Sequence, residues 1–413
     1  MIQTTKQTPC FSDLGIEPRI LNILEKYRFT KPTPIQHQAI PVALRGMDLV
    51  GVAQTGTGKT LAFGVPMIQK LLHEKGQGLI LLPTRELALQ VEETLQKIGQ
   101  PLGLKTAVLI GGAPMFRQIQ MLRRNPHIIV ATPGRIADHL MQRTLTLNQV
   151  KIAVLDEADR MLDIGFAPQI KQIISGLPSQ RQTMLFSATM SAEVSQLAAR
   201  YLKMPLRIEV APSGTAASKV EHEVFIVSKE CKMQLLDKIL AENQGSVLVF
   251  SRTKHGAKRI AASVRGMGHA AVEMHSNRSL AQRRAALQGF KTGQYRVLVA
   301  TDIAARGIDV NGISIVINYD LPENSEDYVH RIGRTGRAEK SGKAISFASP
   351  DQRPDIKSIE KLIRKTLPIL ALPVLPARRA MSREMLTQKI HSGFEDRQEK
   401  WGRNRRSNNF RRR

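Results

Sequence analysis

The chain has 413 residues, of which 42% are hydrophobic and 23% are charged, and at about 150 residues per domain this length predicts two or three domains. The formal net charge of +26 favours a polyanionic partner, with nucleic acid as the first candidate and an anionic membrane surface as the second. Two cysteines far apart in the sequence exclude a disulfide scaffold or a cysteine-rich zinc site and fit a reducing compartment. Without an apolar leader or a run of about 18 apolar residues, neither a signal peptide nor a membrane span is expected.

Short apolar runs rich in β-branched residues alternate with longer segments of helical periodicity along most of the chain. Several runs lack polar alternation, which is typical of strands buried on both faces of a parallel sheet, so we expect repeated βαβ units. The strands expected in the first half are 49–53, 79–82, 107–110, 128–131, 152–155 and 184–186. Those expected in the second half are 223–227, 247–250, 271–274, 297–300, 315–318 and 344–347, with a last helix at 355–365.

Ala, Ser, Gly and Pro dominate residues 211–220, and this composition predicts a linker between two α/β domains. We therefore expect a first domain (1–210), the linker (211–220), a second domain (221–368) and a basic tail (369–413). Residues 397–413 contain eight Arg or Lys and one acidic residue. Such a segment cannot bury enough apolar surface to fold alone, so disorder is expected there.

The segment AQTGTGKT at residues 53–60 follows an expected strand and precedes a helical pattern. It fits the phosphate-loop pattern except that Ala53 replaces the first glycine. Glycines let backbone N–H groups turn toward phosphate oxygens, a Lys can reach the β- and γ-phosphates, and a Thr hydroxyl can ligate Mg²⁺. The predicted nucleotide-binding residues of this loop are Thr55, Gly56, Thr57, Gly58, Lys59 and Thr60, of which Thr60 is also a predicted metal ligand.

An apolar run at 152–155 is followed at once by three carboxylates, Asp156, Glu157 and Asp159. Mg²⁺ bound to a nucleotide needs an acidic side chain at a strand end near the phosphate loop, and Asp156 has that position. Glu157 is placed to orient or deprotonate an attacking water. Acids solvated at the start of a helix are the alternative interpretation.

Residues 156–159 read Asp-Glu-Ala-Asp, and Ser-Ala-Thr at 187–189 and HRIGRTGR at 330–337 follow them in the order of one family. On these motifs the chain resembles the DEAD-box ATP-dependent RNA helicases of superfamily 2, most of all the bacterial type, over roughly residues 11–366. The resemblance implies two tandem RecA-like domains with parallel sheets, ATP and Mg²⁺ as cofactors, and RNA bound across the cleft between them. It also implies a cytoplasmic protein that needs no second subunit to complete its site.

The resemblance assigns roles in nucleotide binding and catalysis. Phe29 would stack on adenine and Gln36 would hydrogen-bond its edge, with Phe11 as the isolated upstream aromatic. Arg334 and Arg337 are similar to arginine fingers, which stabilise charge on the γ-phosphate during phosphoryl transfer. Catalysis is thus expected from Lys59, Asp156, Glu157, Arg334 and Arg337, further nucleotide contacts from Gly307 and Asp309, and coupling between sites from Asp159, Ser187, Thr189 and His330.

The RNA contacts that the resemblance implies lie in turns rich in Gly, Thr and Arg, groups that suit phosphates and 2′-hydroxyls. Aromatic residues make up only 4% of the chain, so recognition independent of base sequence is expected. The implied contacts are Pro83, Thr84, Arg85, Gly111, Gly112, Thr132, Pro133, Gly134, Arg135, Arg252, Arg283, Thr301 and Asp302. Each turn, taken alone, is equally compatible with an ordinary connection between a strand and a helix.

Two positions depart from the family pattern. Arg28 stands where the family usually has Gly, which is expected to change the local turn. Leu280 stands where the family commonly has a Gln that contacts RNA, so one polar contact is expected to be lost.

Alternatives to unwinding remain at this point. The chain could act mainly as an ATP-gated RNA clamp, because clamping and unwinding use the same motifs, or as a DNA helicase, which the adenine motif together with Asp-Glu-Ala-Asp disfavours. The tail, with Trp401 and Phe410 among its Arg residues, is expected to be an auxiliary RNA-binding arm. A purely solubilising tail is the alternative, and no amphipathic helix suggests a membrane partner.

Overall fold

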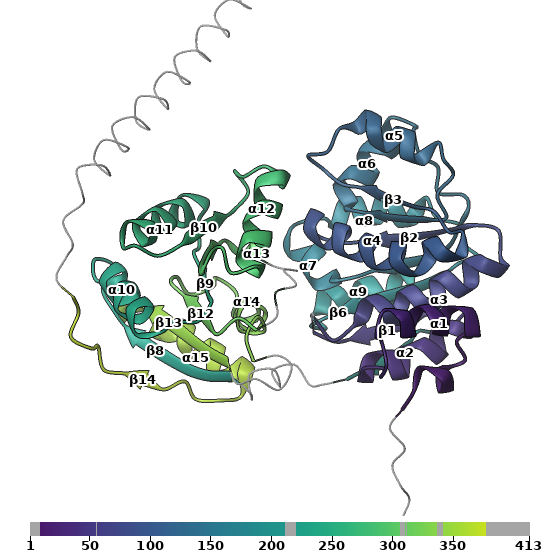
Figure 1. Ribbon diagram of the computed structural model, residues 1–413. Coiled ribbons are helices and arrows are strands. Elements are labelled where there is room, and N and C mark those ends of the chain that lie inside the picture. The colour runs from purple at the N-terminus through teal and green to yellow at the C-terminus, as the bar shows by residue number, and fades with distance from the viewer. Residues whose placement is uncertain are drawn as a thin grey trace, which may run out of the picture.

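The structure of the protein is a computed structural model that describes residues 9–54, 56–210, 220–305, 310, 312–336 and 342–376. Two α/β domains lie side by side, the first formed by the N-terminal half of the chain and the second by the C-terminal half (Figure 1). Each is built around one seven-stranded sheet whose described strand pairs are all parallel, as the alternation of apolar runs and helical segments predicts. The expected α/β fold class is therefore confirmed.

The first sheet has the strand order β3-β4-β2-β5-β6-β1-β7. Its inner strands are buried at nearly every position because helices cover both faces. The strands are β1 (Leu49–Val52), β2 (Gln77–Leu81), β3 (Thr106–Leu109), β4 (Ile128–Ala131), β5 (Val150–Leu155), β6 (Gln182–Ser187) and β7 (Leu206–Glu209).

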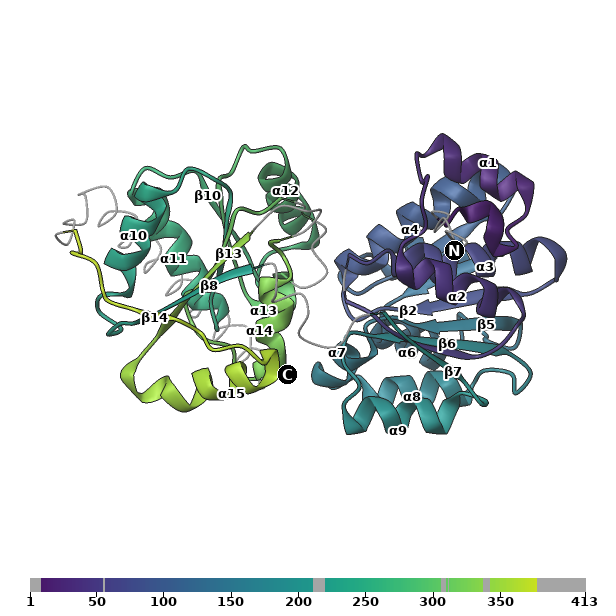
Figure 2. The same cartoon turned by 90° about the horizontal axis from the view of Figure 1, so that it is seen from below.

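The helices of the first domain form two layers, with α1 to α4 on one face of the sheet and α8 and α9 on the other (Figure 2). Ile40, Phe63 and Leu95 belong to the core of the first face, whereas Ile136 and Ile170 belong to the core of the second. The helices are η1 (Phe11–Leu14), α1 (Pro18–Lys26), α2 (Pro34–Leu44), α3 (Lys59–His73), α4 (Arg85–Gly99), η2 (Gln100–Leu102), α5 (Met115–Leu122), α6 (Pro133–Met141), α7 (Ala158–Asp163), α8 (Ala167–Ser175) and α9 (Ala192–Tyr201).

The second sheet repeats the architecture of the first, with the order β10-β11-β9-β12-β13-β8-β14. Its strands are β8 (Val220–Ile226), β9 (Val247–Phe250), β10 (Ala271–Met274), β11 (Val297–Ala300), β12 (Ile315–Asn318), β13 (Gly342–Ala348) and β14 (Ile369–Leu370). Its helices are α10 (Lys232–Glu242), α11 (Lys254–Gly266), α12 (Leu280–Lys291), α13 (Asp302–Ala305), α14 (Ser325–Ile332), η4 (Pro350–Gln352) and α15 (Arg353–Ile363). Side chains of α10 and α11 form one core with the sheet, and those of α12 to α15 form two others.

Three helices that begin at or near residues assigned to RNA are capped by hydroxyl side chains. The Thr84 Oγ1 accepts from the Leu87 N–H at 3.4 Å, the Thr253 Oγ1 from the Gly256 N–H at 3.0 Å, and the Ser279 Oγ from the Gln282 N–H at 3.2 Å. Such caps satisfy N–H groups that have no partner within the helix. They fix the starts of α4, α11 and α12 beside the loops that the sequence assigned to RNA.

One predicted boundary is wrong. Residues 369–376, which we assigned to the tail, belong to the second domain, because β14 pairs with β8. Leu375 packs against the core, and the Gln234 Nε2 donates to the Pro376 carbonyl at 2.8 Å. The prolines in this stretch do not prevent pairing, since an edge strand tolerates proline. The remaining tail, 377–413, and most of the linker lie outside the described residues.

Within the part of the chain that the structure describes, no helix combines the length and the apolar character that crossing a membrane requires.

Candidate functional site

The phosphate loop between β1 and α3 is held against the start of α2. The Thr33 Oγ1 donates to the Thr57 carbonyl at 2.7 Å, and the Gln36 Nε2 donates to the Gly58 carbonyl at 2.9 Å. Gly58 has a φ of 90°, and a Cβ there would stand 2.3 Å from the Gln36 Nε2. Glycine is therefore required at this position by both backbone conformation and space.

Lys59 and Asp156 face each other inside the first domain. The Lys59 Nζ lies 3.3 Å from the Asp156 Oδ1, and both side chains are almost fully buried. Burial alone would lower the pKa of Lys59, but nearby carboxylates raise it, so the ammonium stays charged. Burial raises the pKa of Asp156 despite this ammonium.

This pair fits a nucleotide with a divalent cation. The Lys59 Nζ has no well-aligned hydrogen-bond partner, and a buried ammonium of this kind needs an acceptor such as a phosphate oxygen. Asp156 is a buried carboxylate that a hard cation such as Mg²⁺ would compensate. The donor set therefore suits ATP with Mg²⁺, whose presence would supply the phosphoryl group and the charge that neutralises it.

Glu157 carries a strained backbone and a strongly acidic side chain. Its φ is 52°, in the left-handed region that non-glycine residues rarely occupy outside functional sites. Burial would raise the pKa of Glu157, but Arg160, Lys59, Arg334 and His330 together lower it to about 2. Because Arg334 and His330 belong to the second domain, charges from both domains act on this carboxylate. At this pKa it orients water as an ionised acceptor more readily than it takes a proton.

Three of the four expected coupling residues, Asp159, Ser187 and Thr189, form one hydrogen-bonded cluster. The Asp159 Oδ2 accepts from the backbone N–H groups of Ala188 and Thr189 at 3.0 and 2.9 Å. The Asp159 N–H donates to the Ser187 Oγ at 3.2 Å. The Thr189 Oγ1 also donates to the Glu326 Oε2 of the second domain at 3.4 Å. A path of polar contacts therefore leads from the acidic motif to α14.

The adenine motif lies at the mouth of the same site. Phe29, Gln36, Lys59, Asp156 and Glu157 line a common pocket of about 370 Å³. Phe29 is 38% exposed, which leaves its ring accessible. Gln36 is buried and already bonded, because its Oε1 accepts from the Thr33 N–H at 2.9 Å and its Nε2 donates to the phosphate loop. An adenine contact by Gln36 would share or replace one of these bonds.

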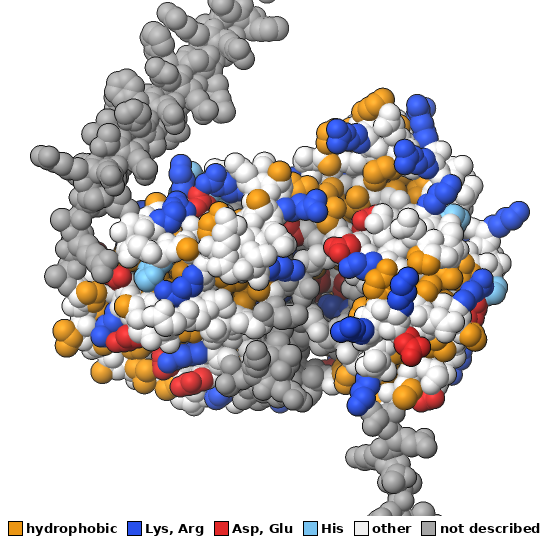
Figure 3. All heavy atoms as spheres, in the orientation of Figure 1, with side chains coloured by type: hydrophobic (Ala, Val, Ile, Leu, Met, Phe, Trp, Pro, Cys, Tyr) orange, Lys and Arg blue, Asp and Glu red, His pale blue; other side chains and the backbone are white. Residues whose placement is uncertain are grey.

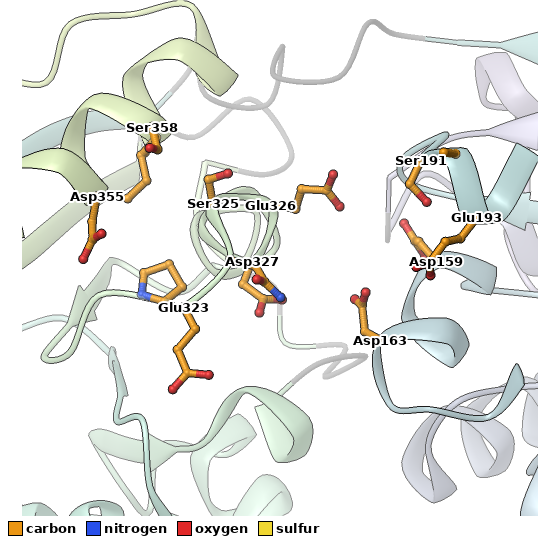
Figure 4. A pocket seen from close by; sticks show the side chains of 14 residues that line it. Asp159, Asp163, Ser191, Glu193, Glu323, Ser325, Glu326, Asp327, Asp355 and Ser358 are labelled. Atoms are coloured by element: carbon orange, nitrogen blue, oxygen red, sulfur yellow. The ribbon is translucent and has the colours of Figure 1, made fainter.

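A second cavity of about 590 Å³ lies between the domains and is lined by acidic side chains. Asp159 and Asp163 approach it from the first domain, and Glu326 and Asp327 from the second (Figure 4). Burial raises the pKa of Glu326, and the charges of Asp163 and Asp159 raise it further. The ionised form of Glu326 is therefore disfavoured while the domains are in this contact.

Three arginines assigned to RNA converge from two domains. The Arg85 guanidinium lies against Gly111 and Gly112, where a Cβ on Gly112 would stand 2.2 Å from it. Burial lowers the pKa of Arg85, and the neighbouring charges of Arg283 and Arg135 lower it further, while Glu86 opposes them. Mutual repulsion among arginines is the property expected of a site that receives phosphates. Lys and Arg are also widespread over the visible surface (Figure 3).

Asp302 does not point freely toward the RNA path. Its two carboxylate oxygens accept from the Arg331 Nε and Nη2 at 2.6 and 2.7 Å. Arg331 is 2% exposed and also donates to the Asn318 Oδ1 at 3.1 Å. This buried network ties the start of α13 and the strand β12 to α14. An RNA contact by Asp302 would have to use the lone pairs of its carboxylate oxygens that do not accept from Arg331.

The remaining assigned residues lie where strands end and helices begin. Thr84, Thr132 and Pro133 are buried at the starts of α4 and α6, and Arg252 is exposed after β9. Pro83 precedes α4, Gly134 lies in the first turn of α6, and Thr301 follows β11. Thr55, Gly307, Asp309 and Arg337 lie outside the described residues.

Sequence reasoning missed four residues of these networks. Glu86 pairs with Arg283 at 3.0 Å, and Arg160 lies 3.5 Å from Glu157. Arg331 and Glu326 make the contacts described above. Arg160 follows the acidic motif, Glu326 precedes the HRIGRTGR motif and Arg331 is its second residue, so position in or near a motif was the only available signal. Nothing in the sequence pairs Glu86 with a residue of the other domain.

The two departures have structural consequences. Arg28 adopts a φ of 61°, so the left-handed turn that a glycine would make is kept by a non-glycine residue at a steric cost. Leu280 packs against the hydrophobic core of the first domain. The position at which we expected the loss of a polar contact to RNA therefore makes an apolar contact between the domains.

Comparisons with known proteins agree with this site. Residues 33–197 match the DEAD/DEAH box helicase family, and residues 231–339 match the helicase conserved C-terminal domain. The chain is 44% identical to the ATP-dependent rRNA helicase RRP3 of Yarrowia lipolytica over 353 residues, which cover 84% of this chain and 73% of that protein. It is 41% identical to the DEAD-box ATP-dependent RNA helicase CshA of Bacillus subtilis, with 89% and 75% covered.

Solved structures show the same two-domain arrangement. S. cerevisiae Dbp5 bound to RNA and ADP BeF3 matches with a TM-score of 0.79 and 29% identity, over 92% of this chain and 98% of that one. Mss116p bound to ssRNA and AMP-PNP matches with a TM-score of 0.80 and 26% identity, over 89% and 81%. The chain belongs to the DEAD-box RNA helicases. It is thus an ATP-dependent enzyme of two RecA-like domains that unwinds or remodels RNA.

Proposed function

We propose that ATP with Mg²⁺ and single-stranded RNA bind cooperatively across the two domains and separate short RNA duplexes locally, without processive movement. The observation that carries this proposal is the position of Glu157, whose pKa is lowered by Arg160 and Lys59 of its own domain and by Arg334 and His330 of the other. Water activation and charge stabilisation are split between domains. Hydrolysis therefore depends on their closure, which RNA promotes by binding both.

The roles of individual residues follow from this proposal. Lys59 and the phosphate loop hold the β- and γ-phosphates, Thr60 and Asp156 hold Mg²⁺, and Glu157 orients the attacking water. Arg334 stabilises the charge on the γ-phosphate, with Arg337 as its proposed neighbour. Asp159 and Thr189 transmit closure through their contact with Glu326. Phe29 and Gln36 select adenine.

The steady-state ATPase rate tests the proposal when it is measured without nucleic acid, with single-stranded RNA, and with DNA of the same sequence. Strong stimulation by RNA alone is the expected result, because 2′-hydroxyl contacts distinguish RNA from DNA. Equal stimulation by both would contradict the RNA assignment. The absence of hydrolysis under every condition would contradict the enzymatic roles.

An ATP-gated RNA clamp is the second candidate, and the contacts that already join the domains favour it. These contacts are the Glu86–Arg283 ion pair, the Thr189–Glu326 hydrogen bond and the packing of Leu280. A duplex-release assay separates the two functions. A clamp would hold RNA with a non-hydrolysable ATP analogue and release almost no strand, whereas an unwinding enzyme releases the strand.

We also propose that the tail is an auxiliary RNA-binding arm and that the protein acts as a cytoplasmic monomer. Residues 397–413 carry eight Arg or Lys and one acidic residue, and such segments bind phosphates in a salt-dependent way. Cys10 and Cys231 are both free thiols, which suits a reducing compartment. Deletion of residues 377–413 should weaken RNA binding and flatten its salt dependence while most core ATPase activity is kept. Unchanged affinity and salt slope would contradict the arm.

A further inference from the structure

The second domain retains a counterpart of the phosphate site in the first. Both sheets have the same strand order, so β8 corresponds to β1 and β12 corresponds to β5. Lys59 is the first residue of α3, and Lys232 is the first residue of α10. The Lys59 Nζ lies 3.3 Å from the Asp156 Oδ1, and the Lys232 Nζ likewise lies 3.3 Å from the Asp320 Oδ1. A buried lysine and an aspartate thus face each other at equivalent positions of the two sheets.

A pocket of about 530 Å³ opens beside the second pair, larger than the pocket of about 370 Å³ beside the first. Small-molecule sites commonly have volumes of roughly 300–1,000 Å³. Four cationic side chains line it, against two acidic ones. The cationic residues are Lys229, Lys232, Arg252 and Arg259, and the acidic residues are Asp320 and Asp351.

The carboxylate of Asp320 is already fully used. Its Oδ2 accepts from the Ser251 Oγ at 3.3 Å and from the Arg252 N–H at 3.1 Å, while its Oδ1 faces Lys232. Within the described part of the chain, Lys229, Arg252 and Arg259 form no ion pair. The pocket is therefore positively charged, and the protein supplies too few acids to neutralise it.

The charge of this pocket is opposite to that of the ATP pocket. Lys59 is surrounded by three carboxylates, which raise its pKa. Burial lowers the pKa of Lys232, and only Asp320 opposes this, while Arg252 and Lys229 lower it further. An anion bound in this pocket would stabilise the charged form of Lys232, as the carboxylates stabilise the charged form of Lys59.

We propose that this pocket, at the carboxyl ends of β8, β9 and β12, is a second phosphate-binding site, which takes a phosphate group of a nucleotide or of RNA. The starts of α10 and α11 border it, and helix starts favour anions. Arg252, which we assigned to the RNA path, lies at its rim, so both sources of phosphate can reach it. The site requires no metal, because its lining is already positive. This inference goes beyond the ATPase site and does not depend on hydrolysis.

Methyl NMR of the full-length chain tests the proposal at a single residue. Ile260 lines this pocket, and Val91 lines the ATP pocket, so their methyl signals report the two sites separately. Inorganic pyrophosphate is the probe, titrated once with Mg²⁺ and once with EDTA. A saturable shift of the Ile260 signal that persists in EDTA is expected.

Two charge-matched double variants serve as test and control. Lys229→Ala with Arg259→Ala removes two exposed cations from the pocket, so the fold is preserved. Lys254→Ala with Lys258→Ala removes two exposed cations from the same region of the chain that do not line the pocket. The first pair should weaken pyrophosphate binding at Ile260 at least about tenfold. The second pair should change it less than about twofold.

Competition then identifies the source of the phosphate. Displacement of pyrophosphate from the Ile260 site by single-stranded RNA assigns the site to the RNA backbone, whereas displacement by ADP and not by RNA assigns it to a nucleotide. No saturable shift at Ile260 with a Kd tighter than about 10 mM would overturn the proposal. Equal weakening by the two double variants would also overturn it, because the binding would then reflect only the general field of a basic protein.

Discussion

Glu86 on α4 and Arg283 on α12 form an ion pair of 3.0 Å across the two domains, although the sequence assigned Arg283 to RNA. Both side chains are nearly buried, at 6% and 10% exposure. The pair lies beside Arg85 and Arg135, which are expected to contact RNA. Arg283 therefore connects the contact between the domains to the surface that is expected to bind RNA, because Glu86 holds its guanidinium near Arg85.

Glu86→Gln should weaken domain closure. The amide leaves the Arg283 charge without an anionic partner when the domains meet. We expect domain closure to lose on the order of 2 kcal/mol, a value between the loss of a surface ion pair and that of a buried one. RNA affinity in the presence of an ATP analogue should fall by about tenfold or more, while ATP binding without RNA is unchanged. Filter binding and nucleotide titration measure the two. The exposed Glu25→Gln is the control, and equal RNA affinity in wild type and Glu86→Gln would contradict the role of the pair.

Leu280→Gln should also loosen the contact between the domains. Leu280 packs against the first domain's core, and losing part of this burial costs about 1 kcal/mol. The glutamine would restore a polar group beside the RNA path. We expect less basal ATPase without RNA and a larger ratio of stimulated to basal rate, both from steady-state kinetics. A smaller ratio than that of wild type would show that the apolar contact does not act in this way.

Sequence patterns predicted the fold well because buried parallel strands are nearly continuous apolar runs. The four-residue strands β4, β9, β11 and β12 have the predicted bounds. The edge strands β7 and β14 were missed, because β7 is mostly exposed and β14 lies among prolines, whereas the edge strands β3 and β10 were predicted. Strands such as β7 and β14 are determined by their neighbours more than by their own composition.

The candidate site was predictable where motifs at the strand ends of one sheet supply its parts. Lys59, Asp156 and Glu157 come together as expected because strand ends of one sheet meet. Contacts between the domains could not be predicted, because Glu86 pairs with Arg283 and Leu280 packs against the other domain, and periodicity does not reveal such distant partners. The bidentate pairing of Asp302 with Arg331 was likewise not predicted, because the two residues lie in separate parts of the sequence and Asp302 was assigned to RNA.

Glu157→Gln should abolish turnover and leave binding intact. The amide keeps the shape of the side chain but cannot hold water as an ionised acceptor, so kcat should fall at least about a hundredfold. The affinities for ATP and RNA should change little, because neither requires this charge. Single-turnover hydrolysis with saturating ATP separates the two effects. Hydrolysis at the wild-type rate would show that another group orients the water.

Glu326→Gln should make domain closure less dependent on pH. The pKa of Glu326 is raised above 4.5 where the domains meet, so contact favours the protonated form. The wild-type contact is then most stable below pH 4.5 and loses stability as pH rises through the raised pKa. Energy transfer between dyes on the two domains measures closure. The variant should close more than wild type at pH 8, with the difference shrinking as pH falls toward 5; a constant difference would contradict this.

Arg28→Gly should stabilise the protein by about 0.5–1 kcal/mol. Arg28 is exposed and has a φ of 61°, a conformation that costs an L-residue about 1–2 kcal/mol and costs glycine almost nothing. The gain is smaller than this cost because glycine has more conformational entropy to lose on folding. Urea unfolding measures it.

Lys31→Gly is the matched control for Arg28→Gly, because it removes a nearby exposed charge at a position whose φ is not positive. It should destabilise the protein, since glycine there relieves no strain. Nucleotide affinity should stay at the wild-type value in Arg28→Gly, because the backbone hand that places Phe29 is unchanged. If both variants destabilise equally, Arg28 is not strained, and another contact of this side chain holds the turn.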